Sequence, residues 1–362
     1  MSSPLRGRLW LIGSIVSLSL LGACAPEDES APTESAPSSE AATVGQELSA
    51  GTDLRNVTVS MAAKSALISA GSPAEVTVTL RNDGRAPVKL LQWYTPANGL
   101  EEPLFVVTRD GQTAKYLGAH YKRPAAQAED YLRVAAGESL TWTVDLAESY
   151  DLSKTGNYSV RLAVGPLQSN ELKVAIEGRP SGARAPVPDV TTQAIAFSKC
   201  DTTQQGLVTQ ALSAASNYAN GAVSYLNGTP SATPRYTTWF GAYSSSGWNK
   251  AKTQFTAIKD VYDTKTVTVD CSCKKKYYAY VYPNQPYIIY VCSVFWQAPM
   301  TGTDSKGGTL VHETSHFTVV AGTDDWAYGQ TDAKALAISD PTRALNNADS
   351  HEYFAENTPA QN

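Results

Sequence analysis

The sequence contains few histidines and cysteines, the residues that most often bind zinc or form cross-links. Its 362 residues include only four histidines and five cysteines. Charged residues make up 17% of the chain and the formal net charge is −5, which argues against nucleic acid as the main partner. Beyond residue 21, no apolar run is long enough to cross a membrane. The positions of the histidines and cysteines in the sequence are therefore the most informative guide to its function.

The N-terminus has the pattern of an export signal. Arg6 and Arg8 precede an apolar run over residues 9–21 that is too short for a spanning helix. The next residues, Leu21-Gly22-Ala23-Cys24, are similar to a bacterial lipobox, which implies cleavage after residue 23 and a lipid on Cys24. An ordinary secretory signal is the alternative. We expect an exported, lipid-anchored bacterial precursor that meets the membrane only through Cys24.

Two of the four histidines have metal-ligand spacing in His312-Glu313-Thr314-Ser315-His316. Positions four apart on a helix lie one above the other, so both imidazoles point at one spot. With the downstream carboxylate of Asp325, they make a three-ligand zinc site with one position open. Glu313 can accept a proton from a water that attacks a carbonyl. A chance pentapeptide on a surface helix is the alternative.

HExxH followed by GTxDxxYG at residues 322–329 resembles the aspzincin metallopeptidases, the deuterolysin-like group whose third zinc ligand is an aspartate. The likeness is closer to the peptidyl-Lys metalloendopeptidases and covers roughly residues 195–362. It is carried further by ATPRYTTWFG at 232–241, AYVYPN at 279–284 and NADSHEYF at 347–354. The resemblance implies one Zn²⁺ held by His312, His316 and Asp325. It also implies Glu313 as general base and Tyr328 as the residue that steadies the oxyanion.

Asp349 and Glu352 are spaced i, i+3, which places both carboxylates on one helical face. In the Lys-specific peptidases that this chain resembles, such a pair lies at the pocket for the residue after the scissile bond. Two carboxylates can hold a compact ammonium, and a slot of that size discriminates against the larger, planar guanidinium. The alternative is a solvated acidic face. His351, between them, is expected to be a local hydrogen-bonding residue.

Apart from Cys24, the cysteines are an even number, as expected for disulfides in an oxidising compartment: Cys200, Cys271, Cys273 and Cys292. Cys271 and Cys273 are too close to pair comfortably with each other. The resemblance implies the pairs Cys200–Cys271 and Cys273–Cys292. A zinc site using Cys-x-Cys is the alternative, which HExxH makes less favourable.

Composition divides the chain into segments. Residues 25–51 are rich in Ala, Pro, Glu and Ser and predict a disordered tether. Residues 52–178 have period-two patterns such as VTVTL at 76–80 and LTWTV at 140–144, separated by turn signals. We predict an all-β immunoglobulin-like sandwich there, and an exposed proline-rich linker at 179–195 that contains the maturation cleavage.

Residues 196–362 predict a zincin-type α+β catalytic domain, helix-dominated around a small sheet. Helical spacing indicates helices at 203–227, 249–262, 329–339 and 341–355, and an active-site helix from about Asp304 to before Gly322. The aromatic runs between residues 277 and 291 predict a hairpin closed by Cys273–Cys292.

The leading hypothesis is a secreted zinc metalloendopeptidase that cuts on the amino side of lysine in protein and peptide substrates. It is made as a latent precursor whose own prodomain covers the cleft. A deuterolysin-like peptidase of broader specificity is the first alternative, and a surface adhesin with a peptidase-like scaffold is the second. His120, near Lys122, is expected to be a surface histidine; capping the zinc in a latent precursor is the alternative.

Overall fold

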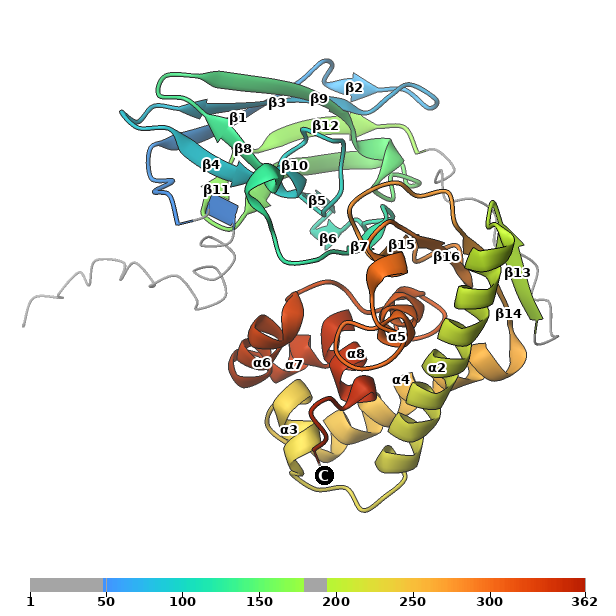
Figure 1. The fold of residues 1–362 in the computed structure, drawn as a ribbon. Coiled ribbons are helices and arrows are strands. Elements are labelled where there is room, and N and C mark those ends of the chain that lie inside the picture. The colour runs from blue at the N-terminus through green and yellow to red at the C-terminus, as the bar shows by residue number, and fades with distance from the viewer. Residues whose placement is uncertain (1–47, 50, 179–193, 362) are drawn as a thin grey trace, which may run out of the picture. The chain divides into compact units, whose positions relative to one another are not determined.

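The computed structural model describes residues 48–49, 51–178 and 194–361 (Figure 1). The predicted signal peptide, the lipobox with Cys24, nearly all of the predicted tether and most of the predicted linker lie outside these residues. Among the helices of the described part, none is long and apolar enough to cross a membrane.

Residues 51–178, called the N-terminal β-region below, consist of short strands joined by turns. The strands are β1 (Val57–Ala63), β2 (Leu67–Ile68), β3 (Glu75–Asn82), β4 (Val88–Leu91), β5 (Phe105–Arg109), β6 (Gln112–Thr113), β7 (His120–Lys122), β8 (Tyr131–Val134), β9 (Ser139–Asp145), β10 (Gly156–Val164), β11 (Leu167–Gln168) and β12 (Leu172–Ile176). Short 3-10 helices lie at Gln92–Tyr94, Ala128–Asp130 and Leu146–Glu148.

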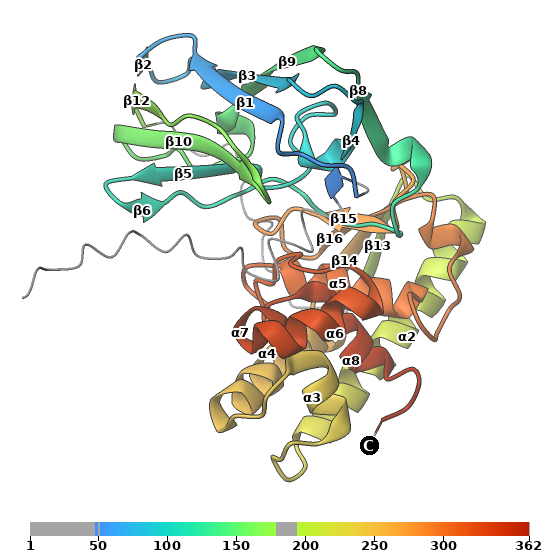
Figure 2. The same ribbon diagram turned by 90° about the vertical axis from the view of Figure 1, so that its left-hand side faces the viewer.

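Most of these strands form two separate sheets that share one hydrophobic core. One sheet has the order β1-β3-β9, and the other has the order β2-β12-β10-β5-β6 with β11 paired to β10 (Figure 2). Burial alternates along β3 and β10, so that residues such as Val78 and Val160 face the core and their neighbours face outward. The predicted period-two strands are therefore present, whereas the immunoglobulin-like topology stays a prediction.

Residues 194–361, called the catalytic region below, are mostly helical. The elements are β13 (Ala194–Ser198), α2 (Thr202–Leu226), α3 (Pro234–Phe240), α4 (Ser245–Thr264), β14 (Thr266–Asp270), β15 (Ala279–Val281), β16 (Ile288–Val291), η4 (Phe295–Gln297), α5 (Lys306–His316), α6 (Gly329–Ser339), α7 (Pro341–Ala344) and α8 (Ala348–Glu356). The helices predicted at 203–227, 249–262 and 329–339 are confirmed within a few residues. The one predicted at 341–355 is interrupted and forms α7 and α8.

One sheet of the catalytic region includes a strand from the N-terminal β-region. Its order is β13-β14-β16-β15-β7, and β15 pairs antiparallel with both β16 and β7. The predicted hairpin is therefore β15–β16. β13 begins at Ala194, inside the predicted linker, and β7 comes from inside the predicted sandwich. The predicted boundary between two domains thus does not separate their sheets.

Two disulfides anchor this sheet, with the pairing that the resemblance implies. Cys200–Cys271 has a Cα–Cα distance of 5.0 Å and ties the start of α2 to the end of β14. Cys273–Cys292 has a Cα–Cα distance of 4.6 Å and closes the β15–β16 hairpin. Both fall within the range that a disulfide requires.

Candidate active site

The helix that carries HExxH, α5, is buried along its whole length. Ser305 caps its N-terminus by accepting a hydrogen bond from the Gly308 backbone N–H. Neighbouring helices approach α5 closely at two glycines: a Cβ on Gly307 would lie 2.8 Å from Ala214 Cβ, and one on Gly308 would lie 2.0 Å from Glu356 Oε1. The two glycines therefore let α2 and α8 pack directly against the helix.

α5 and the loop after it bring three potential ligand atoms together. His312 Nε2 and His316 Nε2 are 3.1 Å apart, and Asp325 Oδ1 is 3.3 Å from the first and 3.4 Å from the second. Ligands about 2.0–2.2 Å from a tetrahedral zinc lie roughly 3.3–3.6 Å from one another. Apart from these two histidines, no described residue pairs with Asp325 Oδ1. This metal group, His312, His316 and Asp325, fits a zinc ion in size and in chemistry.

The outer nitrogen of each imidazole lies next to an oxygen atom: a hydrogen-bonded carbonyl for His316 and an ion-paired carboxylate for His312. His316 Nδ1 is 2.8 Å from the Thr323 carbonyl oxygen, and His312 Nδ1 is 2.8 Å from Asp349 Oδ1. Such partners orient metal-binding histidines and increase their basicity. Burial lowers the pKa of His312, but carboxylates, first that of Asp325, raise it well above its ordinary value. The same negative field favours a bound metal cation.

Glu313 lies on α5 next to the first histidine of the metal group and is fully buried. No described residue donates a hydrogen bond to either of its carboxylate oxygens. Burial raises the pKa of Glu313 to about 7. A buried carboxylate of this kind is a stronger proton acceptor than an exposed glutamate and has oxygens available to a substrate or a water.

The hydroxyl of Tyr328 contacts the N-terminal β-region. It donates a hydrogen bond to Glu102 Oε1 at 3.2 Å and accepts one from Arg123 Nη1 at 3.1 Å. Arg123 also forms a buried ion pair with Glu102. Burial raises the pKa of Tyr328 well above its ordinary value, so the phenol keeps its proton. Tyr328 follows Asp325 by three residues in the chain. Its hydroxyl is already hydrogen-bonded to Glu102 and Arg123 of the N-terminal β-region.

The two carboxylates on α8 are buried, with Asp349 1% and Glu352 0% exposed, so they do not form a solvated acidic face. Between them lies an ammonium that the sequence analysis did not assign, that of Lys122. Its Nζ is 2.6 Å from Glu352 Oε2 and 3.4 Å from Asp349 Oδ1. Lys122 lies in the N-terminal β-region, more than two hundred positions earlier, so nothing in a single sequence links it to α8.

Further residues that the sequence analysis missed complete this lysine pocket, defined as Asp304, Asp349, Glu352, Tyr278 and Tyr353. Asp304 Oδ1 is 3.3 Å from Lys122 Nζ and accepts a hydrogen bond from the Tyr353 hydroxyl at 2.7 Å. The ring centroids of Tyr278 and Tyr353 are 5.2 and 5.6 Å from the same Nζ. Aromatic faces at this distance attract a cation.

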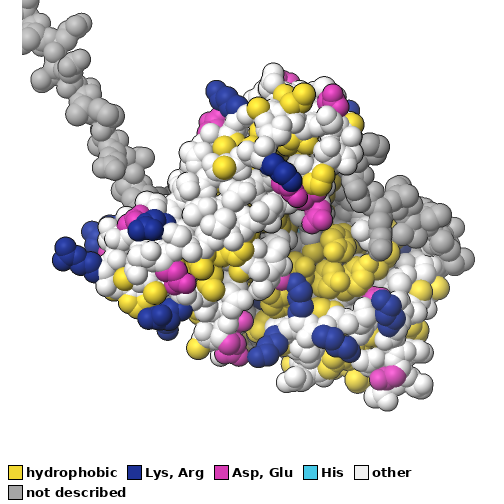
Figure 3. Space-filling model, turned by 90° about the horizontal axis from the view of Figure 1, so that it is seen from above, with side chains coloured by type: hydrophobic (Ala, Val, Ile, Leu, Met, Phe, Trp, Pro, Cys, Tyr) yellow, Lys and Arg dark blue, Asp and Glu magenta, His cyan; other side chains and the backbone are white. Residues whose placement is uncertain are grey.

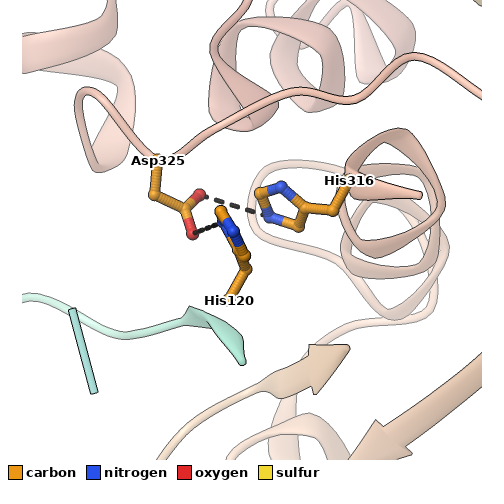
Figure 4. A group of neighbouring side chains, drawn as sticks. All are labelled: His120, His316 and Asp325. Carbon is orange, nitrogen blue, oxygen red and sulfur yellow. Dashed lines mark ion pairs between the residues drawn. The ribbon is translucent and has the colours of Figure 1, made fainter. Parts of the chain in front are cut away.

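His120 is not a surface residue, so that expectation is wrong. Its side chain is 10% exposed, its Nδ1 is 3.8 Å from Asp325 Oδ2, and its ring centroid is 4.7 Å from that of His316 (Figure 4). Burial lowers the pKa of His120 to about 3, so the imidazole is neutral. The face seen in Figure 3 shows no histidine at all.

His351 is a local hydrogen-bonding residue, as predicted. Its Nδ1 is 2.9 Å from the Asn347 carbonyl oxygen and its Nε2 is 3.2 Å from Gln254 Oε1. Both ring nitrogens therefore have partners in the core of the catalytic region.

Comparison with known proteins agrees with this geometry. Residues 225–356 match the aspzincin family, described as lysine-specific metallo-endopeptidase. An extracellular protease of Aeromonas hydrophila is 46% identical over 308 residues, covering 79% of this chain and 89% of the relative. A peptidyl-Lys metalloendopeptidase of Grifola frondosa is 36% identical over 314 residues, covering 79% and 89%. A solved zinc peptidase from Grifola frondosa is 49% identical, with a TM-score of 0.43, and covers 45% of this chain and all of that one.

The matches to the Aeromonas hydrophila protease and to the Grifola frondosa peptidyl-Lys metalloendopeptidase cover more of the chain than the catalytic region alone can supply. The likeness therefore extends into the N-terminal β-region, further than the motifs at residues 195–362 predict. The family and the relatives are all described as peptidases, and no observation favours the alternative of a surface adhesin. The chain belongs to the aspzincin family and is a zinc metalloendopeptidase.

Proposed function

We propose that this peptidase is exported as a latent precursor and that its catalytic region hydrolyses peptide bonds on the amino side of lysine. The observation that carries the proposal is the buried lysine pocket next to the metal group. Asp349 contacts both the ammonium of Lys122 and the Nδ1 of His312. A lysine that follows the scissile bond would thus be bound directly beside the reacting carbonyl.

The pocket has the charge and size for an ammonium. Its carboxylates surround a single Nζ, and the aromatic rings of Tyr278 and Tyr353 flank it. Charge-assisted hydrogen bonds of this kind are among the strongest polar contacts in proteins. A planar guanidinium presents its donors in a rigid fork and does not fit a site shaped around one nitrogen. Lysine is therefore the residue that we expect after the scissile bond.

In the proposed reaction His312, His316 and Asp325 hold the zinc, which polarises the peptide carbonyl and acidifies water when it is bound. Glu313 accepts a proton from the attacking water and then passes it to the leaving amine. Tyr328 donates a hydrogen bond to the oxyanion. Its hydroxyl must first leave Glu102 and Arg123, so the complete site requires removal of the N-terminal β-region.

Export and latency have separate support. The Aeromonas hydrophila relative is named an extracellular protease. The N-terminus has a signal pattern that ends in a lipobox-like Cys24. Residues 120–123 of the N-terminal β-region contact the metal group, the lysine pocket and Tyr328. Cleavage in the segment 179–199 would release the catalytic region from both this contact and a lipid at Cys24.

Digestion of a denatured protein mixture, with mass spectrometry of the new N-termini, tests the specificity. We expect lysine at nearly every new N-terminus, loss of cleavage with a zinc chelator, and recovery when zinc is added. The matched Glu313→Ala protein serves as the blank. New N-termini spread over many residue types would instead favour the broader deuterolysin-like specificity.

A further inference from the structure

One member of the metal group lies on a loop, unlike the other two. The helix α5 fixes His312 and His316. Asp325, by contrast, lies in the loop of residues 317–328 between α5 and α6 (Figure 4). Tyr328, the proposed donor to the oxyanion, ends the same loop as the N-cap residue of α6. Because buried backbone groups outside helices and sheets need other hydrogen-bond partners, the partners of this loop decide where Asp325 and Tyr328 lie.

The backbone at the start of α8 pairs with the loop just before the metal ligand. Asp324 and Asn347 form a parallel β-bridge. The Asp324 N–H donates a hydrogen bond of 2.9 Å to the Asn346 carbonyl, and the Ala348 N–H donates one of 3.0 Å to the Asp324 carbonyl. These two bonds attach the residue directly before Asp325 to the N-terminus of α8.

The side chain of Asn347 binds the residues directly after Asp325. Its Oδ1 accepts hydrogen bonds from the backbone N–H groups of Trp326 and Ala327, at 2.9 and 3.0 Å. Its Nδ2 donates to the Ala327 carbonyl at 3.2 Å and to Ser350 Oγ at 3.1 Å. Asn347 is 0% exposed. An amide offers two lone pairs and two N–H donors, so this buried side chain is fully used, and mostly by the loop.

Asn347 is also the N-cap residue of α8, but its side chain does not serve that helix in the usual way. An N-cap asparagine ordinarily accepts a hydrogen bond from the backbone of the first helical turn. No backbone N–H of the described helix α8 bonds to this side chain, and its acceptor oxygen is used by Trp326 and Ala327 instead. The loop thus takes the oxygen that would otherwise cap the helix.

A further contact fixes the other end of the loop. The Gly329 backbone N–H donates a hydrogen bond of 2.5 Å to Asp349 Oδ2. Residues 346–349 therefore bind the chain before Asp325, directly after it, and directly after Tyr328. All of these bonds join protein groups to one another, so they can form before a metal binds.

We propose that Asn347 is a positioning residue, which holds Asp325 and Tyr328 in their reactive positions whether or not a metal is bound. It acts through the backbone N–H groups of residues 326 and 327. A ligand that is already in place needs no ordering when the metal binds, so the affinity for the metal is higher. The proposal rests on the proposed function, because it takes Asp325 as a metal ligand and Tyr328 as the donor to the oxyanion.

The zinc affinity of the full-length chain tests this role. All proteins carry Glu313→Gln, so that nothing is cleaved, and zinc is titrated in competition with a chromophoric chelator. We expect Asn347→Ala to bind zinc roughly 10–100-fold more weakly than the parent, as when a group that orients a metal ligand is removed. Circular dichroism verifies that each variant is folded. A folded Asn347→Ala protein with the zinc affinity of the parent would overturn the proposal.

Two control variants separate this effect from other causes. Asn82, in the N-terminal β-region, is a matched asparagine, because it is 0% exposed and its Nδ2 donates to three carbonyl oxygens. Asn82→Ala should keep the zinc affinity of the parent; a loss equal to that of Asn347→Ala would reduce the effect to general stability and refute the proposal. Asp325→Ala should lose zinc. Parent-like affinity in that variant would refute the metal group itself, and the proposed function with it.

Amide hydrogen exchange in the zinc-free protein gives a second measurement, which decides even if Asn347→Ala does not fold. The N–H groups of Trp326 and Ala327 should exchange slowly in the parent. They should also do so in Asn347→Asp, which keeps an oxygen to accept both bonds, and exchange at least tenfold faster in Asn347→Ala. Fast exchange of both amides in the zinc-free parent would mean that the metal orders the loop. That result, or equally fast exchange in Asn347→Asp and Asn347→Ala, would contradict the proposal.

Discussion

Asp349 Oδ1 lies 2.8 Å from Nδ1 of His312, while the other oxygen of the same carboxylate accepts a hydrogen bond from the Gly329 backbone N–H. Asp349 is also part of the lysine pocket, at 3.4 Å from Lys122 Nζ. Under the proposed function, this one carboxylate would both orient a zinc ligand and bind the substrate lysine. Glu352 is further from the same His312 Nδ1, at 3.5 Å, and closer to the ammonium.

This difference predicts separate effects for two conservative substitutions. Asp349→Asn should weaken zinc binding roughly 10–100-fold, the usual effect of losing a partner of a metal-bound histidine. Glu352→Gln should keep the zinc and weaken cleavage before lysine by several kcal/mol, because the substrate ammonium loses a buried charged partner. Zinc titration and kcat/KM on a lysine peptide measure the two effects. Identical loss of zinc in both variants would contradict the division of roles.

Substitutions in the metal group should separate metal binding from turnover. His312→Ala, His316→Ala and Asp325→Ala are each expected to lose zinc and all activity. Glu313→Gln is expected to retain zinc and to lose activity by roughly two to four orders of magnitude, since it removes the proton acceptor. Zinc content by atomic absorption and initial rates on one substrate make the comparison. A Glu313→Gln enzyme with near-normal rates would refute the mechanism.

Tyr328→Phe tests the oxyanion contact. Loss of one donor that acts in the transition state costs about 3–4 kcal/mol of barrier, mostly in kcat. The hydroxyl also binds Glu102 and Arg123, so in the full-length precursor the substitution should loosen the N-terminal β-region. Steady-state kinetics of the mature enzyme measure the first effect. An unchanged kcat there would make Tyr328 a structural residue.

The disulfides differ in the length of chain that they close. Cys273–Cys292 spans 19 positions and Cys200–Cys271 spans 71. By loop entropy the short one contributes about 3 kcal/mol and the long one over ~4 kcal/mol to the free energy of unfolding. Paired Cys→Ser variants, compared by urea denaturation, should show the larger loss for Cys200–Cys271. The reverse order would mean that strain in the hairpin dominates.

The proposed maturation can follow two routes, which the Glu313→Ala precursor distinguishes. Lys199 is the nearest lysine to the predicted cleavage segment and its side chain is 69% exposed. It follows β13 directly and precedes Cys200, so cleavage before it requires β13 to open. If the enzyme processes itself, Glu313→Ala precursor stays at full length and the wild-type product begins at Lys199. Processing of Glu313→Ala after Arg179 or Arg184 would indicate a foreign trypsin-like protease.

Local patterns predicted the parts of the site that lie close together in the chain. The spacing of His312 and His316 follows from one helical turn, and that of Asp349 and Glu352 from another, so the sequence predicts both pairs. The helix α3 was missed, although Thr233 at its N-cap and Pro234 at its first position are start signals. Its seven residues are too few to show a helical period.

Contacts between distant segments left no signal in a single sequence. Lys122 and Glu352 meet because β7 joins the catalytic sheet, and the short strand His120–Lys122 has no periodicity to reveal it. No pattern in the sequence around His120 distinguishes it from a surface histidine, because its contact with Asp325 joins distant parts of the chain. The same applies to Asp304, which lies just before α5 and gains its role only through Lys122 and Tyr353.

The burial of Lys122 has an electrostatic consequence for the mature enzyme. In the structure its ammonium forms ion pairs with both Asp349 and Glu352 inside the protein. A buried ion pair that loses one partner is strongly destabilised, typically by about 3–5 kcal/mol. If the N-terminal β-region is released as proposed, the buried carboxylates of the pocket would lose their cationic partner, and each substrate lysine would supply one. Between turnovers the enzyme would be at its least stable, so that primary amines in the solvent would protect it from heat.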